Sequence, residues 1–301
     1  MDQEQFRTGF IALIGRPNVG KSTLMNRLIG MKVAITSNKP QTTRTRIRTV
    51  VTDERCQMIF LDSPGIIEPA NRLGERMMRV AGDVKKDADV ILWVLDAQNK
   101  IGDKERQIGD DLSHVRQSVI IVLNKADLAG EEKCGALEAE LRELFPYAEC
   151  ARVSALKGLQ IDGLREMLIS RLPYGPALYE EDALTDMPER EVVAEIIREK
   201  ALRLLTDEVP HGIAVVTEKM RERDNGIIDI HADIICEKDS HKGIVIGKNG
   251  RMLKKIGSDA RIDIEKLLDA HVNLQLFVKV RAGWRDDVRQ LKNFGLWMDE
   301  T

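Results

Sequence analysis

The 301-residue chain contains only four cysteines, and these are scattered along it. Cys56, Cys134, Cys150 and Cys236 do not have the spacing of metal ligands. We expect them to be reduced thiols that mostly serve as packing residues, as in a protein of the cytosol.

Long hydrophobic runs are also missing. The longest apolar stretches, residues 90–95 and 119–123, suit buried strands and are far too short to span a bilayer. The first five residues are polar and acidic and resemble neither a signal peptide nor a basic transit segment. The composition, 43% hydrophobic and 32% charged, is that of a soluble globular protein, for which we expect a cytoplasmic location.

Charge is distributed unevenly. Residues 238–292 contain 13 Lys and Arg against 7 Asp and Glu, a net charge of +6, whereas the remainder holds 33 against 42, a net charge of −9. A basic C-terminal module on an acidic body indicates that this module meets a polyanion.

Apolar segments alternate with helical stretches over the first part of the chain. Strands are expected at residues 10–14, 47–52, 57–61, 90–95, 119–123 and 150–153, with helices between them, for example at 22–29 and 161–172. This alternation predicts an α/β domain with a doubly wound, mostly parallel sheet. Pro173, Gly175 and Pro176 end the pattern, so we place this domain at residues 1–175 and a linker at 176–190.

Residues 191–301 follow a different order. A helix at 191–206 is followed by strands at 212–220 and 227–236, a short helix around 243–246, a helix to about 268 and a strand at 272–280. This helix–strand–strand–helix–helix–strand order predicts a separate α+β domain.

A phosphate-binding loop follows the first expected strand. Its sequence, Gly-Arg-Pro-Asn-Val-Gly-Lys-Ser at residues 15–22, matches the pattern G-x-x-x-x-G-K-[ST] between a strand and a helix. Backbone N–H groups and the helix N-terminus would face the phosphates, and the lysine would add a point charge. The residues predicted to bind the nucleotide in this part of the chain are Gly15, Arg16, Pro17, Asn18, Val19, Gly20, Lys21, Ser22 and Thr23.

A second pattern, D-x-x-G, begins at Asp62 and ends at Gly65, directly after an expected strand. Asp62 and the hydroxyl of Ser22 are predicted to ligate Mg²⁺, and Gly65 to approach the γ-phosphate. The polar loop Gln41-Thr42-Thr43-Arg44 would supply a further hydroxyl. We favour Thr43, with Thr42 as the alternative. Candidate catalytic residues are Lys21, Thr43, Asp62 and Gly65.

The base is predicted to be guanine. Asn124, Lys125 and Asp127 form the pattern N-K-x-D after an expected strand. A carboxylate at Asp127 can accept from guanine N1–H and the N2 amine, and adenine offers no such donor pair. Asn124 would tie this loop to the phosphate loop. After the last strand of the domain, Ser154, Ala155 and Leu156 form a loop in which a backbone N–H could read guanine O6.

Hydrolysis requires a positioned water. Many small GTPases place Gln directly after D-x-x-G, but here the residue is Ile66, which cannot orient water, so we expect slow intrinsic turnover. Two interpretations of Asn18 stay open: it helps to bind a potassium ion that stabilises developing charge, or it is a structural turn residue.

The C-terminal domain contains G-x-x-G between two expected helices. Such a loop lets a nucleic-acid backbone approach closely. In this element order it is typical of a type II KH domain, which would bind RNA. Because aromatic residues make up only 4% of the chain, we expect aliphatic packing, hydrogen bonds and charge rather than ring stacking. The predicted RNA-binding residues are Ile246, Gly247, Lys248, Asn249, Gly250, Arg251, Lys254 and Lys255.

Over nearly its whole length the chain resembles the Era-like family of bacterial ribosome-assembly GTPases. The resemblance lies in residues 15–22, 41–44, 62–65, 124–127, 154–156 and 247–250. At Ser63 relatives usually have Thr, while Asp62 and Gly65 carry the chemistry. The resemblance implies a P-loop GTPase domain followed by a KH domain. GTP or GDP would bind with Mg²⁺, and the nucleotide state would control binding to 16S ribosomal RNA near its 3′ end in the small subunit.

The resemblance also implies a loose, peripheral association with the inner membrane in some members, and we expect a monomer. Two other functions stay open. A tRNA- or translation-directed GTPase would normally carry a different accessory domain. An RNA-binding chaperone with a purely structural nucleotide would not need Lys21, Ser22, Thr43 and Asp62 all intact.

Overall fold

The computed structural model describes residues 6–31, 43–45, 47–66 and 68–297. The chain forms two compact units, and each is described by itself. Among the described residues, the first unit takes those up to 68 and 77–186, and the second takes 69–76 and 187–297.

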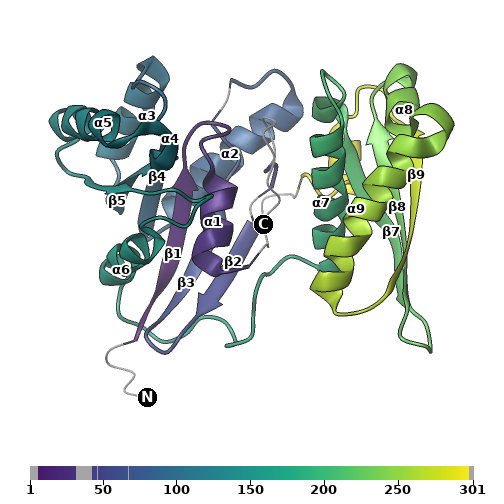
Figure 1. Ribbon diagram of the computed structural model, residues 1–301, viewed down its shortest axis with the longest axis horizontal. Helices are drawn as coiled ribbons and strands as arrows, with labels where there is room; N and C mark the ends of the chain where they lie inside the picture. Colours follow the sequence, from purple (N-terminus) through teal and green to yellow (C-terminus); the bar gives the residue numbers. More distant parts are fainter. Residues whose placement is uncertain (1–5, 32–42, 46, 67, 298–301) are drawn as a thin grey trace. The chain divides into compact units, whose positions relative to one another are not determined.

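The first unit is an α/β fold, as predicted (Figure 1). Its elements are β1 (Arg7–Ile14), α1 (Lys21–Ile29), β2 (Ile47–Thr52), β3 (Cys56–Asp62), α2 (Arg72–Asp87), β4 (Val90–Asp96), α3 (Asp103–Ser113), β5 (Ser118–Asn124), α4 (Ala126–Ala129), α5 (Glu131–Leu144), β6 (Glu149–Arg152) and α6 (Ile161–Arg171), with the start of α2 counted in the second unit. The strand order is β2-β3-β1-β4-β5-β6. The strands pair in parallel except for β2, which runs antiparallel to β3.

Helices cover both faces of this sheet, which explains the continuous apolar runs of its strands. Side chains of α1 and α6 form one core cluster with one face of the sheet, and those of α2, α3 and α5 form a second cluster with the other face. Cys56, Cys134 and Cys236 are buried and Cys150 is partly buried, all as free thiols, which agrees with their predicted packing role.

The parallel register gathers the predicted motifs at one edge of the sheet. Leu13 of β1 pairs with Asp62 of β3, and Asp96 of β4 pairs with Asn124 of β5. The carboxyl ends of these strands therefore lie together, at the point where strand order switches around β1, which is where open α/β sheets bind ligands.

The segment after α6 follows the sheet edge of the first unit. The amides of Leu178 and Tyr179 donate to Oε1 of Gln57 on β3. The Val50 amide donates to the Leu184 oxygen, and Thr185 Oγ1 donates to the Arg48 oxygen on β2. Residues 178–186 thus extend the hydrogen bonding of this edge.

The second unit has the predicted helix–strand–strand–helix–helix–strand order. Its elements are α7 (Glu189–Leu204), a 3-10 turn η1 (Pro210–Gly212), β7 (Ala214–Glu222), β8 (Ile228–Cys236), α8 (Asp239–Ile246), η2 (Lys248–Gly250), α9 (Arg251–Leu268), β9 (Val272–Val280) and α10 (Val288–Asn293). The sheet order is β7-β8-β9, antiparallel then parallel. The predicted short helix near residue 243 begins earlier, at Asp239, because its first turn is polar and lacks the apolar signal.

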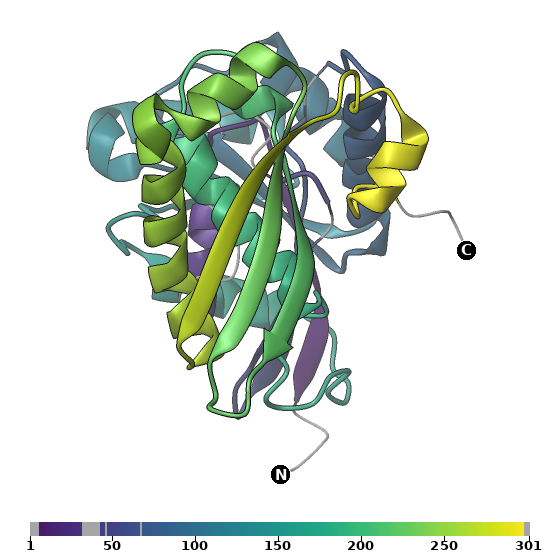
Figure 2. The same ribbon diagram turned by 90° about the vertical axis from the view of Figure 1, so that its right-hand side faces the viewer.

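The core of this unit lies between one face of the sheet and helices α7 and α9 (Figures 1 and 2). Ile230, Ala232 and Ile234 of β8 alternate toward it and are fully buried. Trp284 is also fully buried, and its Nε1 donates to the Gly212 oxygen at 3.1 Å. Trp284 therefore packs the segment after β9 against the rest of this unit.

Candidate nucleotide and nucleic-acid sites

The loop between β1 and α1 has the backbone of a phosphate cradle. Gly15 has φ +151°, Gly20 has φ +98°, and Asn18 is also left-handed at φ +64°. A Cβ atom on Gly20 would lie 2.3 Å from Asn124 Nδ2, so only glycine fits there. No side chain in the described part of the chain caps the N-terminus of α1. Its first N–H groups are therefore available to an anion.

Lys21 is buried beneath this loop. Its Nζ donates to the backbone oxygens of Gly15 and Arg16, both at 3.1 Å. Burial lowers the pKa of Lys21 to about 8, against the opposing effect of the Asp62 carboxylate. An approaching phosphate would stabilise the charged form of Lys21, since opposite charge raises the pKa of an amine.

Three oxygen-bearing side chains meet beside Lys21. Ser22 Oγ donates to Asp62 Oδ2 at 2.9 Å, Thr43 Oγ1 donates to the same oxygen at 3.0 Å, and the two hydroxyl oxygens are 3.3 Å apart. Asp62 is fully buried, and this burial raises the pKa of its carboxyl group. Gln41 and Thr42 lie outside the described residues, so the alternative ligand Thr42 stays untested.

This cluster fits a hard divalent cation. Carboxylate and hydroxyl oxygens are the donors that Mg²⁺ prefers, with phosphates and waters completing its shell. Asp62 Oδ1 is buried and has no hydrogen-bond partner in the part of the chain that the structure describes. Among the described residues, no three or more His, Cys, Asp or Glu side chains are grouped so that they could hold a metal ion by themselves.

The D-x-x-G segment touches the phosphate loop. The Ile66 amide donates to the Gly15 oxygen at 3.2 Å, and a Cβ atom on Gly65 would lie 2.9 Å from Pro17 N. Gly65 therefore lies against the phosphate loop. Its predicted contact with the γ-phosphate fits this position. The Ile66 side chain packs against the apolar cluster of α2, α3 and α5.

Asn124 joins three loops. Its Nδ2 donates to the Val19 oxygen at 2.8 Å, and its Oδ1 accepts from the Ala155 amide at 3.0 Å. The amide side chain is buried, so both bonds are shielded from water. Asn124 thus ties the base-reading segments to the phosphate loop, as the sequence predicts.

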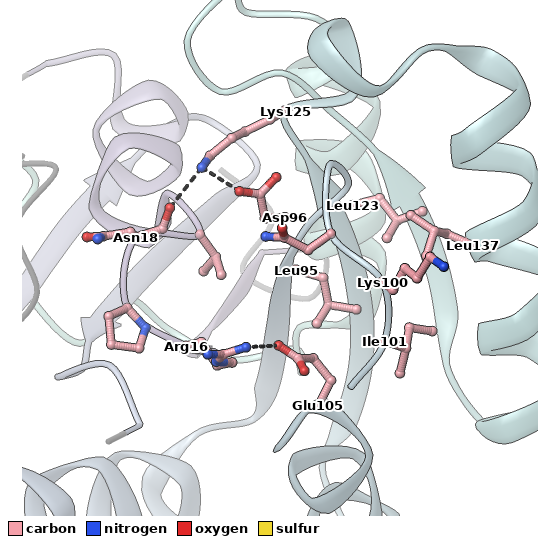
Figure 3. A pocket seen from close by; sticks show the side chains of 13 residues that line it. Arg16, Asn18, Leu95, Asp96, Lys100, Ile101, Glu105, Leu123, Lys125 and Leu137 are labelled. Atoms are coloured by element: carbon pink, nitrogen blue, oxygen red, sulfur yellow. Dashed lines mark hydrogen bonds and ion pairs between the residues drawn. The ribbon is translucent and has the colours of Figure 1, made fainter. Parts of the chain in front are cut away.

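Lys125 makes a second connection to the phosphate loop, shown in Figure 3. Its Nζ donates to the Asn18 oxygen at 2.9 Å and pairs with Asp96 Oδ2 at 2.6 Å. Arg16 pairs with Glu105 of α3 at 2.9 Å in the same view. These residues line a cavity of about 300 Å³ beside the phosphate loop. Asp96 and Glu105 belong to no motif, and sequence reasoning missed them.

The remaining base-reading residues occupy different environments. Ser154 and Ala155 are buried, whereas Leu156 is 71% exposed. Asp127 lies in the short helix α4, and its side chain is exposed. Lys125 just before it has a left-handed backbone at φ +62°, a strained conformation that recurs at functional sites.

The predicted RNA loop connects α8 to α9. Gly247, Asn249 and Gly250 all have positive φ, at +70°, +54° and +72°. A Cβ atom on Gly247 would lie 2.7 Å from Met252 Cβ, whereas one on Gly250 would meet nothing within 4 Å. Gly247 is therefore needed for the turn itself, and Gly250 leaves open space at the surface.

Basic side chains surround this loop. Lys248, Arg251 and Lys254 are exposed at the start of α9 and just before it. Lys255 is also exposed but pairs with Asp259 one turn on, at 3.3 Å. Ile246 is partly buried and adds apolar surface beside the loop. The arrangement offers positive charge and an accessible backbone to an anionic strand.

Comparison with known families agrees with this division. Residues 10–125 match the family model described as a 50S ribosome-binding GTPase, and residues 208–285 match the KH domain model. The structure superimposes with a TM-score of 0.94 and 38% identity on a crystal structure of Era in complex with MgGDPNP and nucleotides 1506–1542 of 16S ribosomal RNA, covering 97% of this chain and all of that one. A variant of Aquifex aeolicus Era bound to GDP and AlF₄⁻ matches with the same score, identity and coverage.

Sequence relatives are similar over almost the full length. GTPase Era of Clostridium perfringens is 49% identical over 290 residues, which is 96% of this chain and 98% of that protein. GTPase Era of Clostridioides difficile is 49% identical over 293 residues with the same coverage. With relatives this similar from end to end, the chain belongs to the Era family of GTPases.

Proposed function

We propose that GTP binding and hydrolysis at the β1–α1 loop control the binding of the second unit to small-subunit ribosomal RNA near its 3′ end. Family membership makes the protein a GTPase with a KH domain. The observation that carries the control role is the cluster of Ser22, Thr43 and Asp62. Thr43 belongs to the loop between α1 and β2, so ligand contacts at this cluster act on that loop directly.

Ser22, Thr43 and Asp62 would hold Mg²⁺ together with phosphate oxygens. When bound, the cation neutralises charge that develops on the phosphates. Lys21 binds phosphate oxygens as a point charge, and the amides of the Gly15–Ser22 loop donate to them. Gly65 brings its amide to the γ-phosphate. Ile66 supplies no hydrogen bond from its side chain, so we propose that intrinsic hydrolysis is slow.

Guanine selection rests on Asp127 and the 154–156 loop. The Asp127 carboxylate accepts from N1–H and the N2 amine, and a backbone amide after Ser154 donates to O6. Asn124 supports this role because it holds both the phosphate loop and the Ala155 amide. The aliphatic stem of Lys125 lies along the base.

For RNA we propose residues 246–251 together with Lys254 and Lys255. The loop offers an exposed Lys248 and open space at Gly250. The relative solved with nucleotides 1506–1542 of 16S ribosomal RNA supports this ligand for the present chain.

We propose a monomer that acts in the cytoplasm, with at most a peripheral contact at the inner membrane. Among the described helices none is long and apolar enough to cross a bilayer. We keep the domain boundaries at 1–175, 176–190 and 191–301, with part of the linker held on the edge of the first sheet. A potassium ion at Asn18 stays a proposal, since the left-handed backbone alone accounts for Asn at that turn.

Phosphate release under multiple turnover tests the enzymatic proposal. We expect slow, Mg²⁺-dependent release of phosphate. The rate of release should change when an RNA fragment containing the 16S 3′ end is added. A protein that binds GTP and RNA but releases no phosphate would be an RNA chaperone with a structural nucleotide. Preferential binding of tRNA over the 16S fragment would instead indicate a translation-directed GTPase.

A further inference from the structure

Arg27 connects helix α1 to the loop after β6. Its Nε donates to the Ala155 oxygen at 3.0 Å and its Nη2 donates to the Leu156 oxygen at 2.7 Å. In sequence, Arg27 is 128 residues from Ala155 and 129 residues from Leu156. Since α1 begins at Lys21, one helix carries both the phosphate-binding lysine and the residue that holds the 154–156 loop.

The bond to Ala155 fixes the direction of a neighbouring amide. The Ala155 C=O and the Leu156 N–H belong to one planar peptide unit, and no described peptide bond is cis. In a trans unit these two groups point to opposite sides. With its carbonyl held toward Arg27, the unit therefore directs the Leu156 N–H away from α1.

This amide differs from its neighbours in the loop. The Ser154 amide donates to the Leu159 oxygen, Ala155 to Asn124 Oδ1, Lys157 to Ser154 Oγ, and Gly158 to the Ser154 oxygen. Within the part of the chain that the structure describes, the Leu156 amide donates to no acceptor. The loop thus presents one unused donor, and its orientation depends on Arg27.

We propose that Arg27 is a positioning residue for base recognition, which orients the Leu156 amide toward guanine O6. This inference rests on the proposed guanine site. Without the guanidinium, the peptide unit between Ala155 and Leu156 can rotate. A rotated unit would turn the Ala155 carbonyl oxygen toward O6, and the two oxygens would repel each other. The planar fork of arginine suits two adjacent carbonyls, and a lysine ammonium would satisfy them less well.

The backbone of Gly158 lies beside the Arg27 guanidinium. Its backbone is left-handed at φ +76°, and a Cβ atom there would lie 3.7 Å from Arg27 Cζ. The Arg27 side chain is exposed, so water can replace part of its bonding. We therefore expect a moderate effect on affinity rather than loss of the site.

The test compares three nucleotides by calorimetric binding. GDP has O6, N1–H and the N2 amine, IDP retains O6 and N1–H but lacks the amine, and 2-aminopurine riboside diphosphate retains the amine but lacks O6 and the hydrogen on N1. The Arg27→Ala variant should bind GDP and IDP about fivefold more weakly, the loss of one ordinary hydrogen bond. Its affinity for the 2-aminopurine diphosphate should stay within about twofold of the wild type. Arg27→Lys should recover part of the loss.

Arg7→Ala is the matched control. Arg7 Nη1 donates to the backbone oxygens of Ser170 and Leu172 at the start of β1, the end of the strand opposite the phosphate loop. The Arg7→Ala substitution should leave the affinity for all three nucleotides unchanged. Thermal melting of each variant confirms folding, and Arg27→Lys serves if Arg27→Ala does not fold.

The outcomes separate this inference from the function on which it rests. An equal loss for all three nucleotides, or no loss for GDP, would overturn the role of Arg27. If the wild type bound the 2-aminopurine diphosphate as tightly as GDP, the 154–156 loop would not read the base at all. That result would reject the proposed guanine site itself.

Discussion

Asn124 Nδ2 donates to the backbone oxygen of Val19 at 2.8 Å, across 105 residues of sequence. The same side chain accepts from the Ala155 amide. One buried amide thus holds the phosphate loop and both base-reading loops in a fixed relation. A nucleotide that binds at these loops meets a site whose parts are already placed, which reduces the entropy that binding would otherwise cost.

The first prediction concerns base choice. Asp127→Asn replaces two acceptor oxygens with one acceptor and one donor, and xanthine has a carbonyl where guanine has its amine. The variant should lose about 100-fold or more in GTP affinity and gain affinity for XTP. Because the Asp127 side chain is exposed, the substitution should change the free energy of unfolding by less than about 0.5 kcal/mol. Competition binding with GTP and XTP is the measurement, and an unchanged preference for GTP would remove Asp127 from base selection.

The second prediction uses the pKa of Lys21, which burial lowers to about 8. Phosphate binding raises this pKa, so below pH 8 the amine is protonated in both states and affinity is independent of this group. Above pH 8 binding must take up a proton, and affinity should fall as pH rises, by up to tenfold per pH unit. Calorimetry of GDP binding at pH 8.5, in buffers of different ionisation enthalpy, measures the uptake.

Lys21→Arg is the control for this experiment. Arginine stays charged at every accessible pH, so the proton uptake that Lys21 contributes should disappear, while any contribution of the guanine base remains. The same uptake in both proteins would show that Lys21 is not the group that titrates.

The third prediction decides between the two interpretations of Asn18. If it helps to bind potassium, hydrolysis should be about tenfold faster in KCl than in NaCl, equivalent to about 1.4 kcal/mol at the transition state. Asn18→Gly is the appropriate variant because glycine accepts the φ of +64° without strain. It should abolish the difference between the salts. Equal rates in both salts for the wild type would leave Asn18 as a turn residue.

The fourth prediction concerns the RNA loop. Removing a basic side chain that binds one phosphate should reduce the salt slope of single-strand binding by about 0.7. Lys248→Ala and Lys254→Ala should each show this change, and Lys255→Ala a smaller one, since Lys255 already pairs with Asp259. Filter binding over a range of salt concentrations measures the slope. Unchanged slopes for Lys248 and Lys254 would place the RNA elsewhere.

Asn249→Asp separates RNA binding from folding. Asp tolerates the left-handed backbone at φ +54°, so the loop should keep its shape while it gains a negative charge. RNA affinity should fall and GDP affinity should not. Gly247→Asp is a poor substitute because its Cβ would strike Met252 and disturb the turn between α8 and α9.

Much of the fold was predictable because its signals are local. Apolar strands, their alternation with helices and the glycine-containing loops predicted both the mostly parallel sheet and the order of the second unit. The structure also brings Ser22, Thr43 and Asp62 together within 3.3 Å, as the motif spacing required. The roles of these residues stay proposals.

The interactions that sequence reasoning missed are long-range. Arg27, Asp96 and Glu105 belong to no motif, and each acts on a loop far away in sequence or on another element. The attachment of residues 178–186 to β2 and β3 is of the same kind, since nothing in a proline-containing acidic stretch indicates which strand it will pair with. Such interactions depend on tertiary packing, which one sequence does not display.

The most direct test of the account measures how nucleotide state changes RNA affinity. With Mg²⁺ and a non-hydrolysable GTP analogue, the wild type should bind a fragment containing the 16S 3′ end at least about fivefold more tightly than with GDP, the lower range of allosteric coupling. Thr43→Ser, which retains the hydroxyl, should keep the difference, and Thr43→Ala should lose it while still binding GDP. Equal RNA affinity of the wild type in the two nucleotide states would contradict the claim that GTP controls RNA binding.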